Sequence, residues 1–159
     1  MASGVKISIS TIGIKKLRAQ IGRRSRLLTI GVHEEATADV DDGNTKKSVK
    51  VAPYAAANEF GTERIPSRPF LKNTMKEHSK DWERLLIAEL KNRGNGLQTA
   101  LNAVGNAATG DVKATITEGN FTALKPQTIK NKERKGRPKP SAILIDTGSL
   151  IKSIVYKVK

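Results

Sequence analysis

A run of basic side chains is the segment of this sequence with the clearest capacity for chemistry. Six lysine and arginine residues fall within ten positions: Lys130, Lys132, Arg134, Lys135, Arg137 and Lys139. Ammonium and guanidinium groups at this density attract phosphates, so the run predicts contact with a polyanion such as nucleic acid. A solvated basic loop has the same composition and is the alternative. The run contains no aromatic residue, which disfavours binding by base stacking.

Other polar clusters lack the partners that metal binding or catalysis needs. One acidic cluster shares part of the calcium-loop pattern: Asp39, Asp41, Asp42 and Gly43. Lys50 occupies the place of its closing glutamate, so we expect no calcium site. His33 and the two glutamates after it lack the second histidine of a zinc protease. The sequence has no cysteine and no phosphate-binding glycine loop. We therefore expect a protein that is not an enzyme and that holds no metal or cofactor.

The composition predicts one small basic domain. The chain has 159 residues, 37% of them hydrophobic, which is enough for a modest core. Its 29 basic and 15 acidic residues give a formal charge of +14, and more than half of this excess lies in residues 119–159. No apolar run approaches the roughly 18 residues of a membrane span, and no secretion signal is evident. We expect a soluble protein made in the cytoplasm, without a membrane partner.

Hydrophobic periodicity predicts the elements that must position these groups. Strands are expected over residues 5–11, 26–32 and 154–158, with a protruding hairpin over 36–51 that turns at Asp42-Gly43. Helices are expected over residues 14–21, 53–60, 69–93 and 149–153, with another from 97 towards 116 and one or two turns within 124–132. The longest predicted helix places these residues on one face: Leu71, Met75, His78, Trp82, Leu85 and Leu86.

The resulting fold class is α/β in the α+β sense. We expect one small mixed or antiparallel sheet, built from all the strands and the hairpin, that packs against the long helix 69–93 and several shorter helices. The whole chain, 1–159, is expected to be a single domain with a basic loop at 125–140. His78 is expected to be a packing residue.

Two motifs occur together in a characteristic order. The first is Ala-Ala-Ala-Asn-Glu-Phe-Gly-Thr at 55–62, followed by Ile-Pro-Ser-Arg-Pro-Phe-Leu at 65–71. The second is Leu-Ile-Asp-Thr-Gly-Ser-Leu at 144–150, ahead of the last predicted strand. In order and separation they resemble the tailed-bacteriophage neck proteins, called head–tail joining, tail-completion or virion-morphogenesis proteins. The segment 125–132 also matches this group, whereas the insertion at 39–50 and the very basic tail depart from it.

The resemblance implies a structural protein of the virion neck, made in the cytoplasm of the bacterial host. Its copies would form a ring that joins tail to head and leaves a passage for DNA. The group implies six subunits, or twelve for a ring docked on the portal, with head-completion, connector, tail-terminator or tail-tube proteins as neighbours. A tail terminator subunit is one alternative. A free basic nucleic-acid-binding protein is another, which the net charge favours.

The motifs also predict the site residues. The corner between the two helices of the first motif is expected to be an assembly interface formed by Glu59, Phe60, Gly61, Arg64, Pro66, Arg68, Pro69 and Phe70, with a purely structural corner as the alternative. Gly61 is expected to end its helix in a left-handed conformation, and Arg68 to bond Glu59 or backbone carbonyls. Residues 146–148 predict a helix N-cap turn. The basic run is expected to be extended and to face either the DNA channel or an acidic neighbouring ring.

Overall fold

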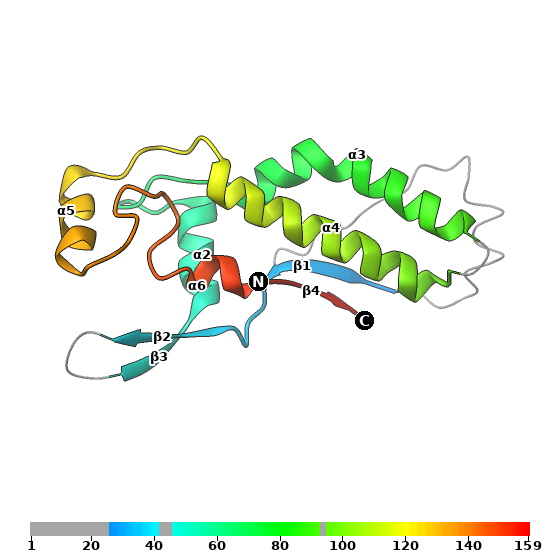
Figure 1. The fold of residues 1–159 in the computed structure, drawn as a ribbon, viewed down its shortest axis with the longest axis horizontal. Coiled ribbons are helices and arrows are strands. Elements are labelled where there is room, and N and C mark those ends of the chain that lie inside the picture. The colour runs from blue at the N-terminus through cyan, green and yellow to red at the C-terminus, as the bar shows by residue number, and fades with distance from the viewer. Residues whose placement is uncertain (1–25, 42–45, 93–94) are drawn as a thin grey trace.

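The computed structural model describes residues 26–41, 46–92 and 95–159, which form an α+β fold of several helices and two small antiparallel sheets (Figure 1). This confirms the predicted fold class. The predicted strand 5–11, the predicted helix 14–21 and the Asp42-Gly43 turn lie outside the described residues.

The first sheet joins two segments from opposite ends of the described chain. Strand β1 (Leu28–Val32) pairs antiparallel with β4 (Ile154–Val158), with Leu28 opposite Val158. Leu28, Ile30 and Ile154 are buried on the face that the helices cover. Backbone hydrogen bonds between Leu27 and Lys159, of 2.9 and 3.0 Å, extend the pairing by one residue. Both predicted strands are confirmed.

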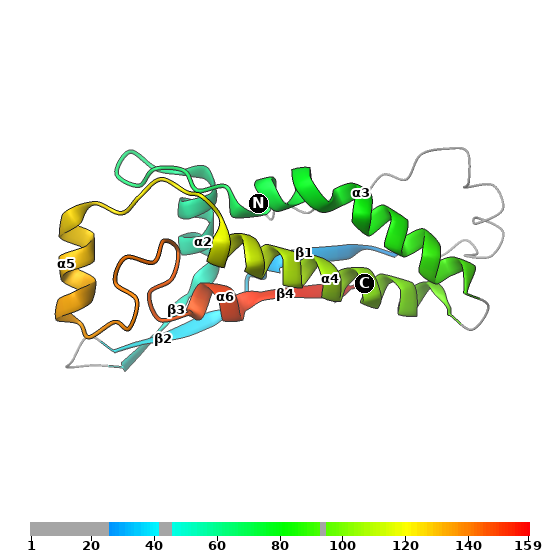
Figure 2. The same cartoon turned by 45° about the horizontal axis from the view of Figure 1, so that its top comes forward.

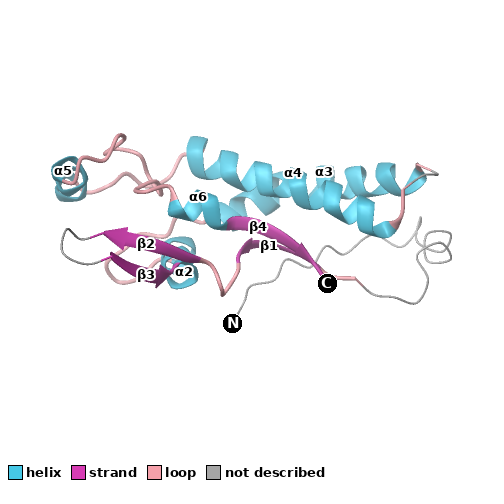
Figure 3. Cartoon of the chain, turned by 60° about the horizontal axis from the view of Figure 1, so that its bottom comes forward, coloured by secondary structure: helices cyan, strands magenta, loops and turns pink. Residues whose placement is uncertain are grey.

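The hairpin forms a second, separate sheet, so the prediction of a single sheet is wrong. Strands β2 (Thr37–Asp41) and β3 (Lys46–Lys50) pair only with each other, and Figure 3 shows them apart from β1 and β4. The physical reason is the polarity of the hairpin. Residues 47–50 are all exposed and three of the four are polar, so β3 offers little apolar surface with which to extend the core sheet.

Two helices of 22 residues each lie side by side over the core sheet: α3 (Phe70–Lys91) and α4 (Leu97–Glu118) (Figure 1). We expected the helix at 69–93 to pack across the sheet, but α4 makes the main contacts with β1 and β4, and α3 packs along α4. The difference follows from the small side chains of α4. Gly105 of this helix lies against the ring of Tyr156 on β4, and its lack of a side chain lets the strand approach α4 closely.

Trp82 joins the two long helices. Its side chain is 2% exposed, and its indole Nε1 donates a 2.6 Å hydrogen bond to the carboxylate Oδ2 of Asp111 on α4. The His78 ring stacks on the indole with a centroid distance of 6.4 Å and an interplanar angle of 20°. This places His78 in the packing role that its position in the sequence predicts.

Gly105 supports a prediction about the packing of α4. A Cβ atom at this position would lie 2.4 Å from Cδ2 of Tyr156, so Gly105→Ala is expected to lower the free energy of unfolding by about 1–3 kcal/mol. In a Tyr156→Ala background the same change should be neutral or stabilising, because alanine favours helix over glycine by about 1 kcal/mol. Gly110→Ala is the matched control, since no atom lies within 4 Å of its added Cβ. Chemical denaturation of the wild type and the four variants measures these changes, and equal effects at positions 105 and 110 would contradict the packing.

Three short helices complete the fold. Helix α2 (Val51–Phe60) continues directly from β3 and begins two residues before the predicted proline start. Helix α5 (Pro126–Arg134) begins with proline in its first turn, and α6 (Ser149–Ser153) has the predicted bounds. Helix α5 confirms the one or two helical turns predicted within 124–132, whereas the basic segment expected to be a loop is helical as far as Arg134. No described helix has the length and apolar character needed to cross a membrane.

Candidate functional site

The first motif folds into a corner between α2 and α3, and Glu59 forms its centre. Glu59 is only 7% exposed. Its carboxylate oxygens accept hydrogen bonds of 2.9 Å from the backbone N–H groups of Leu71 and Lys72. These groups belong to the first turn of α3, where N–H groups lack partners within the helix and the helix dipole favours a negative charge. Glu59 therefore caps a helix that begins eleven residues after it in the sequence.

Arg68 fixes the loop of the corner from inside the protein. It is 6% exposed, its Nε donates to the carbonyl of Thr122 at 3.1 Å, and its guanidinium reaches Oδ1 of Asn58 at 3.5 Å. Its backbone N–H donates to the carbonyl of Asn58 at 2.7 Å. The predicted bonds to carbonyls are present, whereas no bond joins Arg68 to Glu59. Asn58 was not among the predicted site residues, although its place directly before Glu59 makes it the natural partner of a returning loop.

The remaining residues of the corner divide between interior and surface. Phe70 is fully buried, and Pro69 is half-buried. Gly61 has φ 78° and ψ 170°, so φ is positive as predicted, but ψ is extended rather than left-handed helical. A Cβ there would lie 2.9 Å from the backbone nitrogen of Ser67, which explains the need for glycine.

Phe60, Arg64 and Pro66 are the corner residues that face solvent. Phe60 is 68% exposed at the end of α2, which is unusual for a phenylalanine. Of the eight predicted interface residues, these three expose side chains that a neighbouring protein could contact. Three other predicted interface residues are buried and stabilise the fold of the chain itself: Glu59, Arg68 and Phe70.

The basic run divides in the same way. The ammonium group of Lys132 donates to the carbonyls of Ala142 and Ile145 at 2.8 and 2.5 Å, and Lys132 is 9% exposed. Burial lowers the pKa of this ammonium group. Arg137 pairs with Asp146 at 3.1 Å and is half-buried. The exposed cations of the run are Lys130, Arg134, Lys135 and Lys139.

Lys132 and Arg137 hold the second motif against α5. We call α5 and residues 135–148 the basic arm, and Figure 2 shows it beside α2, away from most of the α3–α4 pair. Within it Leu144 is buried with φ 61°, a conformation that leucine rarely adopts. Gly148, with φ 80°, is the N-cap residue of α6. The carboxylate of Asp146 does not bond the helix and instead accepts a hydrogen bond from Arg137. The predicted turn is present, and the hydroxyl of Thr147 accepts a 3.4 Å hydrogen bond from the backbone N–H of Ser149, the first residue of α6.

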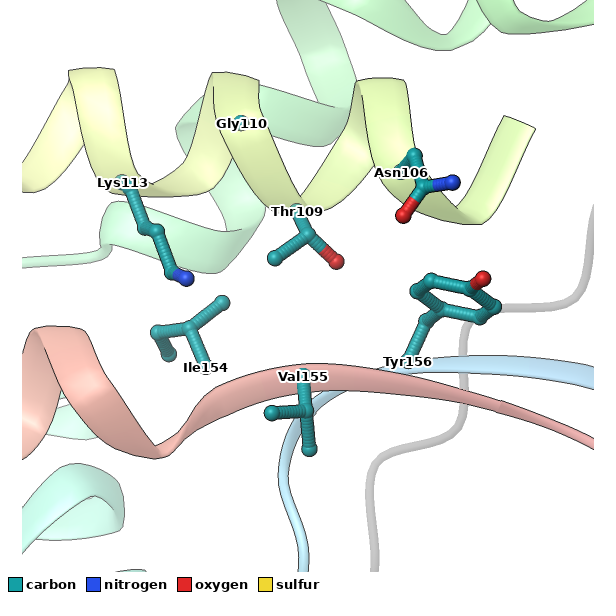
Figure 4. A pocket seen from close by; sticks show the side chains of 7 residues that line it. All are labelled: Asn106, Thr109, Gly110, Lys113, Ile154, Val155 and Tyr156. Carbon is teal, nitrogen blue, oxygen red and sulfur yellow. The ribbon is translucent and has the colours of Figure 1, made fainter. Parts of the chain in front are cut away.

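Two open grooves lie beside β4. One, of about 520 Å³, runs between α4 and β4 and is lined by Asn106, Thr109, Gly110, Lys113, Ile154, Val155 and Tyr156 (Figure 4). The other, of about 570 Å³, lies between the start of the hairpin and α6 and contains His33, Glu35 and Ser149.

His33 in the second groove differs in its bonding from the general base of a catalytic triad. Burial and the nearby ammonium groups of Lys157 and Lys159 lower the pKa of His33 and so favour the neutral form of its ring. A general base in a triad is bonded both to a nucleophile and to an orienting acid. The ring of His33 bonds the backbone of Val155, and its Nε2 has no partner among the described residues. Within those residues, no three histidine, aspartate or glutamate side chains gather in a way that could hold a metal ion.

Comparisons with protein-family models, with curated proteins and with solved structures find no match to this chain.

Proposed function

We propose that this chain is a structural subunit of a ring in the neck of a tailed bacteriophage, where it joins tail to head around a passage for DNA. The proposal rests first on the two sequence motifs and their order. In the structure, residues of both motifs form hydrogen bonds that join segments distant in the sequence. Such residues are expected to recur as a set wherever this fold is used, because each needs its partner.

The observation that carries the proposal furthest is the exposed aromatic residue on a rigid corner. Two buried groups, Glu59 and Arg68, fix the loop that follows Phe60 through hydrogen bonds to α3, Asn58 and Thr122. A large aromatic side chain that is held out on a fixed support costs little entropy to bury against a partner. This geometry supports an assembly contact at Phe60.

Two further elements suit a subunit that contacts neighbours on more than one side. The β2–β3 hairpin extends from the body with Val49 exposed, and the basic arm lies next to it (Figures 1 and 2). A closed ring needs two different complementary surfaces on each subunit. Exposed cations of the arm would attract the phosphates of passing DNA without reading its bases.

Replacing Phe60 by alanine is the test of this proposal. We expect the wild-type chain to form rings, and Phe60→Ala to weaken their assembly by about tenfold or more, because aromatic residues at interface centres contribute most of the binding energy. Native mass spectrometry and negative-stain imaging measure the assembly. The stability of the isolated subunit should not change, since Phe60 is mostly outside the core.

Leu27→Ala is the matched control, because Leu27 is also an exposed apolar residue but lies beside the core sheet, away from the corner. It should leave assembly unchanged. A wild-type chain that remains monomeric and binds DNA tightly would overturn the ring and favour a free nucleic-acid-binding protein. Equal loss of rings in both variants would overturn the role of Phe60.

A further inference from the structure

The outward face of α3 carries a regular row of cations. Lys72, Lys76, Lys80 and Arg84 are spaced four residues apart, and all four side chains are exposed; Lys91 continues the same face. Residues four apart lie on successive turns of one side of a helix. At a rise of about 1.5 Å per residue, the charges follow each other at intervals of roughly 6 Å. We call Lys72, Lys76, Lys80 and Arg84 the α3 row.

The α3 row is the face of the helix opposite to the core. The buried residues of α3 are Phe70, Thr74, Trp82 and Leu86, which contact the rest of the domain. No described element covers the row, since α4 packs on the buried side. The long axis of this surface is the axis of the helix, about 33 Å for 22 residues.

The charges of the row are largely uncompensated. Arg84 pairs with Asp81 at 2.9 Å. Among the described residues, Lys72, Lys76 and Lys80 have no carboxylate within ion-pair distance. Like charges four residues apart repel each other and destabilise a helix. The exposed carboxylates of Glu77 and Asp81, three residues before Lys80 and Arg84, offset part of this repulsion, and a polyanionic partner would offset the rest.

The type and spacing of the cationic groups in the row indicate which kind of partner it could bind. It offers three ammonium groups and the guanidinium of Arg84, evenly spaced on flexible stems, and none of its four residues is an aromatic or an amide. A straight, regular line of point charges matches the uniform phosphate backbone of a duplex better than the irregular surface of a folded protein. From this we infer that the α3 row binds the phosphate backbone of double-stranded DNA, independently of its sequence. The inference deepens the proposed function, on which its setting in the neck depends.

The test measures DNA binding by the full chain. A row variant changes Lys72, Lys76, Lys80 and Arg84 to glutamine. The control variant changes four exposed lysines elsewhere: Lys47, Lys50, Lys152 and Lys159. Fluorescence anisotropy follows binding of a labelled duplex of about 20 base pairs at several salt concentrations, since the logarithm of the affinity falls linearly with that of salt. Circular dichroism checks that both variants keep their helices.

We expect the row variant to lose at least about tenfold in affinity near 0.1 M salt, with the salt slope reduced by roughly 0.9 for each lost contact. The control variant, with the same net charge, should lose much less. Duplexes of different sequence should bind the wild-type chain equally well.

Equal losses in the row and control variants would overturn the inference, because net charge alone would then explain the binding. A wild-type chain that ignores DNA but binds polyglutamate through the row would also overturn it, in favour of an acidic protein partner. Assembly is read separately by native mass spectrometry. Row-dependent DNA binding by a chain that forms no rings would refute the proposed neck function and leave this inference standing. Rings whose affinity for DNA does not depend on the row would refute this inference and leave the proposed neck function standing.

Discussion

Trp82→Ala is expected to lower the free energy of unfolding by about 3–5 kcal/mol, the cost of emptying a large aromatic site in a core. Trp82 fills the contact between α3 and α4, the two longest helices. The truncation also leaves the carboxylate of Asp111 without its indole donor. Both losses act on the same pair of helices, so the effect should be among the largest of any single substitution in this chain.

Chemical denaturation measures this loss of stability. Two further variants separate the loss of the hydrogen bond from the loss of ring volume and provide a control. Trp82→Phe keeps most of the ring volume but removes the N–H donor, so it should cost only about 1–2 kcal/mol. Asn73→Ala, an exposed change on the same helix, should stay within about 0.5 kcal/mol of the wild type. An unchanged denaturation midpoint for Trp82→Ala would show that α3 does not pack through this residue.

Glu59→Ala is expected to cost about 3 kcal/mol of stability. The change removes two charge-assisted hydrogen bonds and leaves the backbone N–H groups of Leu71 and Lys72 without acceptors in a partly buried position. Glu59→Gln should cost less, because the amide oxygen still accepts one bond while the charge that favours the helix N-terminus is lost. Thermal unfolding of the purified subunit measures both.

Glu63→Ala is the control for this pair, since Glu63 is an exposed carboxylate of the same loop. It should leave stability within about 0.5 kcal/mol. The opposite pattern, a Glu59→Ala subunit of normal stability that no longer forms rings, would return Glu59 to the interface role that its sequence motif first indicated.

Local patterns in the sequence were sufficient to predict most elements. The helix at 149–153 and the strand at 154–158 have the predicted bounds, because the glycine at 148 and the β-branched residues after Ser153 mark them. The start of α3 is also close to prediction, since the prolines at 66 and 69 exclude helix before it. Each of these signals acts over a few residues.

Local patterns did not predict which of the two long helices, α3 or α4, packs against the core sheet. Both long helices are amphipathic, and their periodicity does not indicate which of them covers the sheet. The small residues of α4 decided it, through a contact such as that between Gly105 and the ring of Tyr156. That contact joins residues far apart in the chain, and periodicity within one helix carries no information about it.

The candidate site shows the same division. The sequence indicated the importance of the corner and of the basic run, but opposite charge was a poor guide to pairing. Arg68 bonds an amide and a carbonyl rather than Glu59, and Lys132 bonds two carbonyls inside the arm. Burial determined these partners, because a buried charge needs several hydrogen bonds from fixed directions. The α3 row was not predicted, although the four-residue spacing of its cations in the sequence is a signal that could have indicated it.

The pairing of β1 with β4 has a consequence for the order of events during synthesis. Thr29 and Lys157 face each other across the sheet although they are 128 positions apart. At roughly 5–20 residues per second, a ribosome adds β4 about 6 to 26 s after β1. During that interval β1 lacks β4, the strand with which it pairs in the described residues, and the face of α4 that β4 will cover is open to solvent. The newly made chain is thus most exposed to aggregation and to chaperones in the seconds before β4 emerges.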